Sequence, residues 1–119
     1  MYIVKNPILE ELYFIRDKFG IELNMDYKNP SLYYIFKEDN NIIGFSEIII
    51  ADNLPTLIKF YVGEDYKDEE KLFFLKGTGS KVKDMGFDYL KNKTNSLQFY
   101  KNNLEDINLD KLFLGTCND

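Results

Sequence analysis

The sequence has no histidine, no tryptophan and a single cysteine, Cys117. Without histidine, the Ser-His-Asp and Cys-His nucleophile systems and the usual histidine-containing zinc sites are excluded. One cysteine cannot form an internal disulfide, which agrees with a reducing compartment. Any acid or base chemistry must therefore use carboxylates, tyrosine, lysine or the substrate itself.

Long apolar runs are also missing. No segment approaches the ~20 apolar residues that a membrane span needs. The N-terminus lacks the charged start, apolar middle and cleavage site of a signal peptide. We therefore expect a cytoplasmic protein with no membrane partner.

The composition is that of a folded chain. Hydrophobic residues make up 45% of the 119 residues and aromatic residues 16%, which is outside the range of disordered proteins. This length suffices for one core and is too short for two. We expect one domain that covers residues 1–119.

The charge is uneven along the chain. The net charge of −5 argues against nucleic acid as a partner. Residues 71–101 nevertheless hold seven lysines and two aspartates. Two interpretations stay open for this basic block: lysines on solvated helix faces, or a wall that binds an anion.

The N-terminal part predicts a strand over residues 2–4 and a helix over residues 7–20. Asn6 is the expected helix cap, with Pro7 at the first helical position and Gly20 as the stop. Apolar residues recur at spacings of three and four, which places them on one helix face: Ile8, Leu12, Ile15 and Phe19.

A hairpin is predicted next. Residues 32–36 and 42–50 are rich in aromatic and β-branched types, and the loop at 38–41 contains asparagines, which tolerate positive φ. Gly44, within the second strand, predicts a bulge or a close backbone approach.

A strand–turn–helix unit follows, with the strand at 56–62 and the helix ending near residue 85. Gly77 and Gly79 each cost roughly 1 kcal/mol inside a helix, so the helix bends, breaks or uses these glycines for packing. The segment GTGSK lacks the spacing and the preceding strand of a phosphate-binding loop.

The C-terminal part predicts a strand at 87–91, a helix at 97–103 capped by Asn95 and Ser96, and a last strand at 109–114. The whole order predicts an α/β (α+β) fold, with a mixed sheet of five to seven strands and helices on both faces.

Four pieces in this order resemble the GNAT acetyltransferase superfamily. They are the hairpin segment at 40–48 (NNIIGFSEI), the pair Tyr66-Lys67 after a strand, Gly86 at the end of a helix, and the segment at 95–101 (NSLQFYK). The resemblance implies a sheet whose strands at 56–62 and 87–91 splay apart to form a cleft.

The resemblance also implies acetyl-coenzyme A as cofactor, with its pyrophosphate at the turn after the fourth strand. The turn departs from the family motif, because Glu70 and Leu72 stand where glycines belong. Its carboxylates predict weak binding, although acidic residues are also what an ordinary helix start prefers. The implied cofactor-binding residues are Tyr61, Val62, Lys67, Asp68, Glu69, Glu70, Lys71 and Asn95.

Tyr100 stands where the family has a tyrosine that protonates the leaving thiolate; a packing role is the alternative. Glu47 and Glu64 are the candidate general bases. Two functions stay open: an N-acetyltransferase acting on a small-molecule or peptide amine, and a non-catalytic GNAT-fold module for binding or regulation, for instance as a homodimer.

Overall fold

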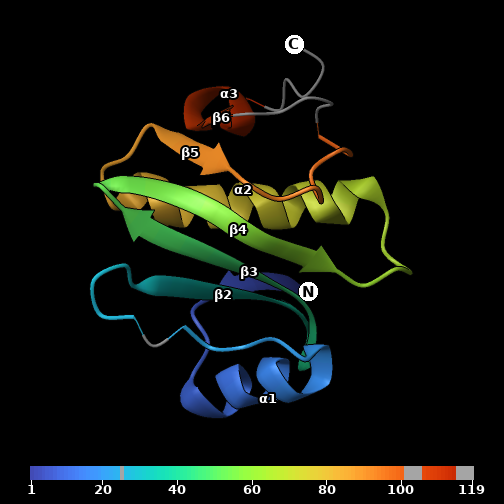
Figure 1. Ribbon diagram of the computed structural model, residues 1–119. Helices are drawn as coiled ribbons and strands as arrows, with labels where there is room; N and C mark the ends of the chain where they lie inside the picture. Colours follow the sequence, from blue (N-terminus) through green and yellow to red (C-terminus); the bar gives the residue numbers. More distant parts are fainter. Residues whose placement is uncertain (25, 101–105, 115–119) are drawn as a thin grey trace.

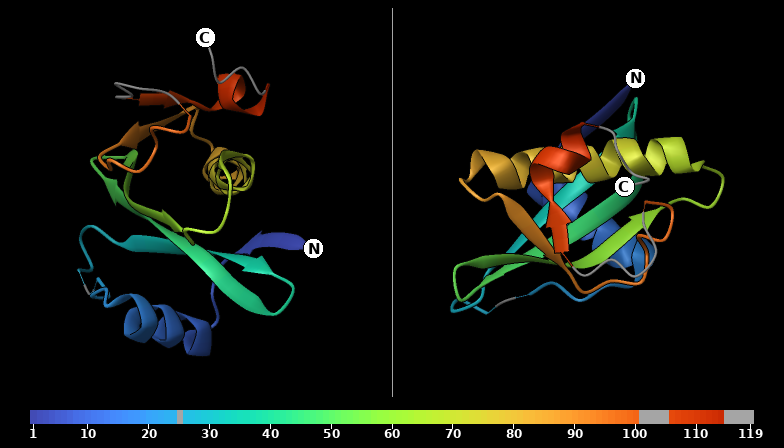
Figure 2. Two further views of the ribbon diagram at one scale, coloured as in Figure 1. Left: turned by 90° about the vertical axis from the view of Figure 1, so that its right-hand side faces the viewer. Right: turned by 90° about the horizontal axis from the view of Figure 1, so that it is seen from above.

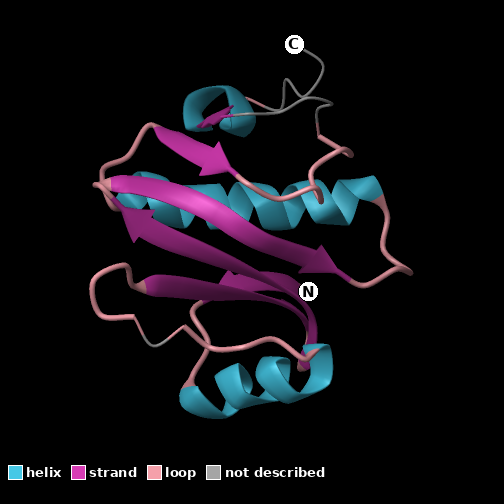
Figure 3. Cartoon of the chain, viewed as in Figure 1, coloured by secondary structure: helices cyan, strands magenta, loops and turns pink. Residues whose placement is uncertain are grey.

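In the computed structural model, residues 1–24, 26–100 and 106–114 are described (Figure 1). Within them, six strands form one mixed sheet in the order β1-β2-β3-β4-β5-β6 (Figure 3). The strands are β1 (Tyr2–Lys5), β2 (Ser31–Glu38), β3 (Asn41–Ala51), β4 (Leu54–Val62), β5 (Tyr89–Asn92) and β6 (Asp106–Asn108). The helices are α1 (Leu9–Phe19), α2 (Asp68–Asp84) and α3 (Leu109–Phe113).

Strands β1 to β4 pair antiparallel in chain order, with α1 between β1 and β2 and with tight turns between β2 and β3 and between β3 and β4. Among the described strands, only β4 and β5 pair in parallel. The β2–β3 hairpin confirms the prediction, but its positive φ falls on Asp39 (55°) rather than on an asparagine. Asp52 and Asn53 turn β3 into β4 with φ of 53° and 61°. Two successive positive φ values match the twist of the strands they join.

Gly44 has both features that the sequence predicts. A Cβ at this position would lie 2.4 Å from the carbonyl oxygen of Tyr61, so β3 and β4 approach too closely for any side chain. The register with β2 also shifts here, since Phe36 pairs with Gly44 while Lys37 pairs with Ile42. The extra residue, Ile43, forms the bulge.

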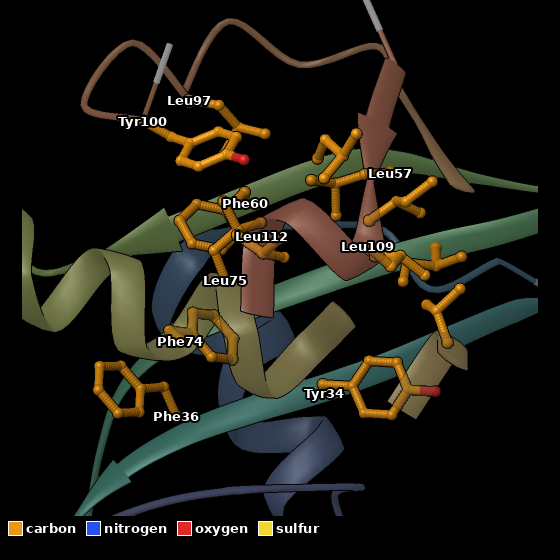
Figure 4. Close-up of a cluster of buried hydrophobic side chains, with 14 of the residues drawn as sticks. Tyr34, Phe36, Leu57, Phe60, Phe74, Leu75, Leu97, Tyr100, Leu109 and Leu112 are labelled. Atoms are coloured by element: carbon orange, nitrogen blue, oxygen red, sulfur yellow. The ribbon is translucent and has the colours of Figure 1, made fainter. Parts of the chain in front are cut away.

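The two long helices cover opposite faces of the sheet (Figure 2). Under α1 lies a small core of Ile15, Tyr33, Ile35 and Phe45. Under α2 lies a larger core (Figure 4). Its main aromatic and aliphatic members include Phe36, Ile48, Leu57, Phe60, Phe74, Leu75, Leu90 and Leu112.

Helix α2 is continuous over Asp68–Asp84, so its glycines neither bend nor break it into two. A Cβ on Gly77 would lie 2.5 Å from Val4 of β1, and one on Gly79 would lie 2.9 Å from Leu112 of α3. Both glycines therefore serve packing. Beside them, the buried hydroxyls of Ser46 and Thr78 lie 3.1 Å apart and link β3 to α2.

The predicted start of the first helix is wrong. Its N-cap is Ile8 rather than Asn6, because the side chain of Glu11 accepts the N–H of Ile8 at 3.0 Å. Asn6 instead reaches the carbonyl of Tyr33. Ile8 is also mostly exposed, so it does not belong to the buried helix face as predicted. The predicted stop at Gly20 is confirmed by its φ of 66°.

Two predictions near the C-terminus also need correction. Residues 97–100 form a turn, with the N–H of Tyr100 bonded to the carbonyl of Leu97, and residues 101–103 lie outside the described residues. The predicted strand at 109–114 is helix α3, because the Asn108 side chain accepts the N–H of Lys111 and caps a helical turn. None of the described helices is long and apolar enough to cross a membrane.

Candidate functional site

The sheet opens where β4 and β5 part. The two strands pair only at Thr56 with Lys91 and at Leu57 with Asn92. The N–H of Lys93 then bonds the carbonyl of Leu57 at 2.9 Å, after which β4 continues to Val62 without a β5 partner. The predicted splay is present, and it exposes one backbone edge of β4 to a ligand or to another segment.

A bulge in β4 lies at this opening. Glu47 of β3 pairs with Lys59 and Ile48 pairs with Leu57, which leaves Ile58 as an extra residue. Bulges re-aim side chains and backbone groups, and they occur often near active sites.

A cavity of about 520 Å³ lies beside the bulge. Its walls come from the loop after α1, the end of β3, the start of β4 and the residue after β5. They consist of Asn24, Asp26, Asn29, Ile49, Ala51, Asp52, Thr56, Ile58 and Lys93.

The charged groups of the cavity wall are Asp26, Asp52 and Lys93, so the lining carries a net negative charge. The backbone N–H of Lys28 and the side chain of Asn29 lower the pKa of Asp26. Asp26 is therefore a carboxylate at neutral pH, and this wall favours a cationic ligand.

Glu47 lies behind this wall, with an exposed fraction of 2%. The Ser31 hydroxyl donates to Oε2 of Glu47 at 2.6 Å. The Asn24 side-chain amide in turn donates to the Ser31 hydroxyl at 2.7 Å. A chain of two hydrogen bonds thus joins the buried carboxylate to the cavity.

The other oxygen of Glu47, Oε1, has no hydrogen-bond donor among the described residues. It lies 3.5 Å from Nζ of Lys59, which forms an ion pair with it. Burial and the nearby Glu47 raise the pKa of Tyr33, whose hydroxyl accepts the N–H of Asn24. Burying a carboxylate is costly unless its oxygens are satisfied. The ion pair with Lys59 is therefore what compensates Oε1 for its missing hydrogen bond.

Tyr100 lies on the opposite face of the sheet. It is 9% exposed within the α2-side core, where Figure 4 shows its ring beside Leu97 and Phe60. The neighbouring Phe99 ring stacks on Phe60 with centroids 5.8 Å apart. This turn covers β4 beyond the point at which β5 leaves it. The structure therefore places Tyr100 and Glu47 on different sides of β4.

The turn between β4 and α2 is held against the β2–β3 hairpin by hydrogen bonds. Tyr66 packs its ring against Gly63, and its hydroxyl donates to Glu38 at 2.7 Å. This bond, with burial, raises the pKa of Tyr66 to about 12. The N–H of Gly63 bonds the carbonyl of Ile43. The turn is thus tied to the β2–β3 hairpin.

The first turn of α2 does not fit a pyrophosphate well. The side chain of Glu70 lies 3.4 Å from the N–H of Lys67, where a phosphate oxygen would bind. Asp68 is largely exposed and lies 4.0 Å from Nζ of Lys71, and Glu69 is exposed. Three carboxylates thus stand in the first helical turn, whose N–H groups an anion would need.

The remaining sequence-predicted residues are dispersed. Tyr61 lies on the α1 face with its ring 5.0 Å from that of Phe19, whereas Val62 is buried in the α2-side core. Asn95 is exposed in the turn after β5, and Glu64 is exposed in the turn after β4. The described residues contain no group of three or more carboxylates or thiols that could hold a metal ion.

Sequence reasoning missed the residues of the cavity wall. Asn24, Asp26, Asn29 and Lys93 all lie between the strands and helices that the sequence predicts. The sequence feature that could have indicated a site is the high proportion of Asn and Asp in residues 24–29. Only the strand order brings this loop beside the start of β4.

No protein-family model matches the sequence, and no curated protein sequence matches it. Solved structures do match. The ribosomal-protein-S18-alanine N-acetyltransferase from Escherichia coli superposes with a TM-score of 0.60 at 14% identity, over 84% of this chain and 74% of that one. An acetyltransferase from Vibrio fischeri gives 0.54 at 15% identity, over 76% and 94%.

A third match is the PaiA N-acetyltransferase from Thermoplasma acidophilum, solved in complex with coenzyme A. Its TM-score is 0.50 at 21% identity, over 76% of this chain and 55% of that one. At these identities, the likeness concerns the arrangement of strands and helices, and activity has to be argued from the residues.

Proposed function

Because the chain has the fold of the GNAT acetyltransferases, we propose that it is an N-acetyltransferase acting on a cationic amine. One observation carries the proposal. An acidic cavity lies against the bulge in β4, at the point where β4 and β5 separate. An amine and an acyl group can meet there from the two sides of the strand.

The amine side is the cavity on the α1 face. Asp26 and Asp52 attract an ammonium group to it. The amine must lose a proton before it can attack, and Glu47 is the better placed of the two candidate bases. Ser31 and Asn24 link Glu47 to the cavity wall, whereas Glu64 is exposed in a turn that contributes nothing to the wall.

The acyl side is the α2 face. Acetyl-coenzyme A, when bound, supplies the acyl group as a thioester. The β4 backbone near Ile58 offers N–H groups that can polarise a carbonyl. The hydroxyl of Tyr100 can supply the proton that the departing sulfur takes up.

Tyr100→Phe tests the acyl side. If the hydroxyl is the acid, turnover should fall by ~10²–10⁴ while cofactor affinity stays nearly unchanged, since only one oxygen is lost. Tyr34→Phe is the matched control, because Tyr34 is a buried tyrosine of the same core. Equal turnover in wild type and Tyr100→Phe would assign Tyr100 to packing.

The carboxylates at the start of α2 predict weak binding of coenzyme A. Calorimetry should show tighter binding after Glu69→Gln with Glu70→Gly, by about tenfold for each ~1.4 kcal/mol of repulsion removed. Glu64→Gln removes a carboxylate from the same turn outside the helix and serves as control. Tight binding by the natural sequence, unchanged in the double variant, would contradict this placement of the pyrophosphate.

The same carboxylates favour a second candidate, a GNAT-fold binding module that no longer uses the cofactor and acts through a bound partner or as a homodimer. A thermal shift with acetyl-coenzyme A, compared with desulfo-coenzyme A and pantetheine, separates the two. A shift with acetyl-coenzyme A that pantetheine does not reproduce supports the transferase. No shift with any of them supports the module.

A further inference from the structure

A second concave surface lies far from the opening between β4 and β5. It is a groove of about 500 Å³ between β1 and α2. We define the β1 groove by its apolar floor of Val4, Phe73 and Gly77 and its polar rim of Lys76, Ser80 and Lys81. Phe73 is 47% exposed here although it is a large apolar side chain.

The strand beside the groove has a free backbone edge. β1 is the last strand of the described sheet on this side. The N–H of Asp39 bonds the carbonyl of Met1. In an antiparallel pair such bonds recur at every second residue, so Ile3 and Lys5 also face β2. Tyr2 and Val4 therefore direct their N–H and C=O groups outward, as a template for another strand.

Two of the usual protections of an edge strand are missing from β1, although the strand is short, with four residues. It contains no proline, and its pairing with β2 has no bulge. Lys5 is the residue that would repel an added strand, but it is engaged by Glu11 at 2.8 Å.

The rim of the groove carries unpaired positive charge. On α2, Lys71 and Lys83 form ion pairs with aspartates. Lys76 and Lys81 form none with the described residues. The chain as a whole carries a net charge of −5, but the lining of this groove contains two lysines and no carboxylate, which fits an acidic partner.

The two lysines flank the apolar floor of the groove, one on each side. At roughly 100° per residue, Phe73, Gly77 and Ser80 form the middle of one face of α2, and Lys76 and Lys81 form its two borders. Along the helix axis the two lysines are offset by about 7.5 Å, in addition to the width of the face between them. Residues i and i+2 of a strand are about 6.7 Å apart and point to the same side.

We propose that the β1 groove binds an extended acidic peptide segment of a partner protein, which pairs with β1 as an added strand. Its acidic residues stand at alternate positions and face Lys76 and Lys81. Its intervening apolar residues lie on the other side of the added strand, beside Ile3, which is 40% exposed. This is strand addition with a charge requirement.

The probe is a short fluorescent peptide in which Glu alternates with Val, titrated against the full chain. It should bind saturably and weaken as salt rises. The same peptide with Lys in place of Glu should not bind. Lys76→Glu with Lys81→Glu should weaken the Glu peptide at least tenfold. Lys28→Glu with Lys91→Glu, which makes the same charge change at exposed positions elsewhere, should weaken it less than threefold.

N-methylation of the peptide tests the strand pairing. Alternate N–H groups of an added strand face β1, so methylating one set should abolish binding and methylating the other set should preserve it. Thermal melting of each protein variant verifies that it is folded. Three results would overturn the proposal: no saturable binding, equal effects of the two methylated peptides, or sedimentation showing that a second copy of the chain occupies β1.

Discussion

The two faces of the sheet bury different kinds of side chain. The α2 face holds one continuous core of aromatic and aliphatic side chains, with Ser46 and Thr78 as its buried hydroxyl pair. The α1 face has a smaller core and two buried or half-buried carboxylates. Glu11 is held by Lys5 and Lys37, and Glu47 is held by Ser31 and Lys59.

This difference separates stability from chemistry. Apolar burial is the main favourable term in folding, so the α2 face should dominate the unfolding free energy. A buried ion pair adds little net stability, although removing one of its partners destabilises the protein. Such a pair can also position reactive groups. The α1 face is accordingly the one that holds the proposed amine cavity.

The largest effect is expected from Phe74→Ala on the α2 face. Phe74 is fully buried and stacks on Phe36 and Phe60 with centroids 5.0 and 5.1 Å away. Deleting such a ring costs ~3–5 kcal/mol. Chemical denaturation should show this loss. Phe19→Ala, which removes a half-buried ring from the α1 face, should cost less than half as much, and an equal cost would erase the contrast between the faces.

A smaller effect, dependent on pH, is expected from Glu11→Gln. Burial alone would raise the pKa of Glu11, but hydrogen bonds from Lys5, the Ile8 N–H and Lys37 lower it from 4.5 to about 2. A pKa lowered by folding gives stability that is present above about pH 4.5 and is lost as the pH falls toward 2.

At neutral pH, Glu11→Gln should therefore lose about 2 kcal/mol, after allowance for solvent screening. The difference from wild type should shrink as the pH is lowered below 4.5. Urea denaturation across this pH range measures it. Glu10→Gln is the control, since Glu10 is exposed on the same helical turn. A difference that stays constant with pH would contradict the role assigned to the ionised carboxylate.

The smallest effect is expected from Gly77→Ala. In an ordinary helix this change stabilises by about 1 kcal/mol. Here the new Cβ would lie 2.5 Å from Val4, and overpacking costs ~1–3 kcal/mol. A net loss of ~1 kcal/mol in thermal unfolding is expected, whereas Ser80→Ala on the same helix should be neutral or slightly stabilising. A gain from Gly77→Ala would mean that β1 is not packed against α2.

The sequence by itself determined the order and type of most elements, because these follow from local rules. Richness in aromatic and β-branched residues predicted β2 and β3, the 3–4 spacing predicted α1, and Gly20 ended that helix. The close approach at Gly44 was predicted for the same reason, since a glycine within a strand has few other uses.

Only the tertiary structure decided which residues form a site. The strand order brings Asn24, Asp26 and Asn29 beside Ile58. The alternation of β3 and β4 puts Glu47 and Lys59 on the face opposite Tyr100. It also decided that Gly77 and Gly79 serve packing, and that Asn108 begins a helix rather than a strand. These outcomes depend on contacts between distant segments, which propensity and periodicity within a short window do not contain.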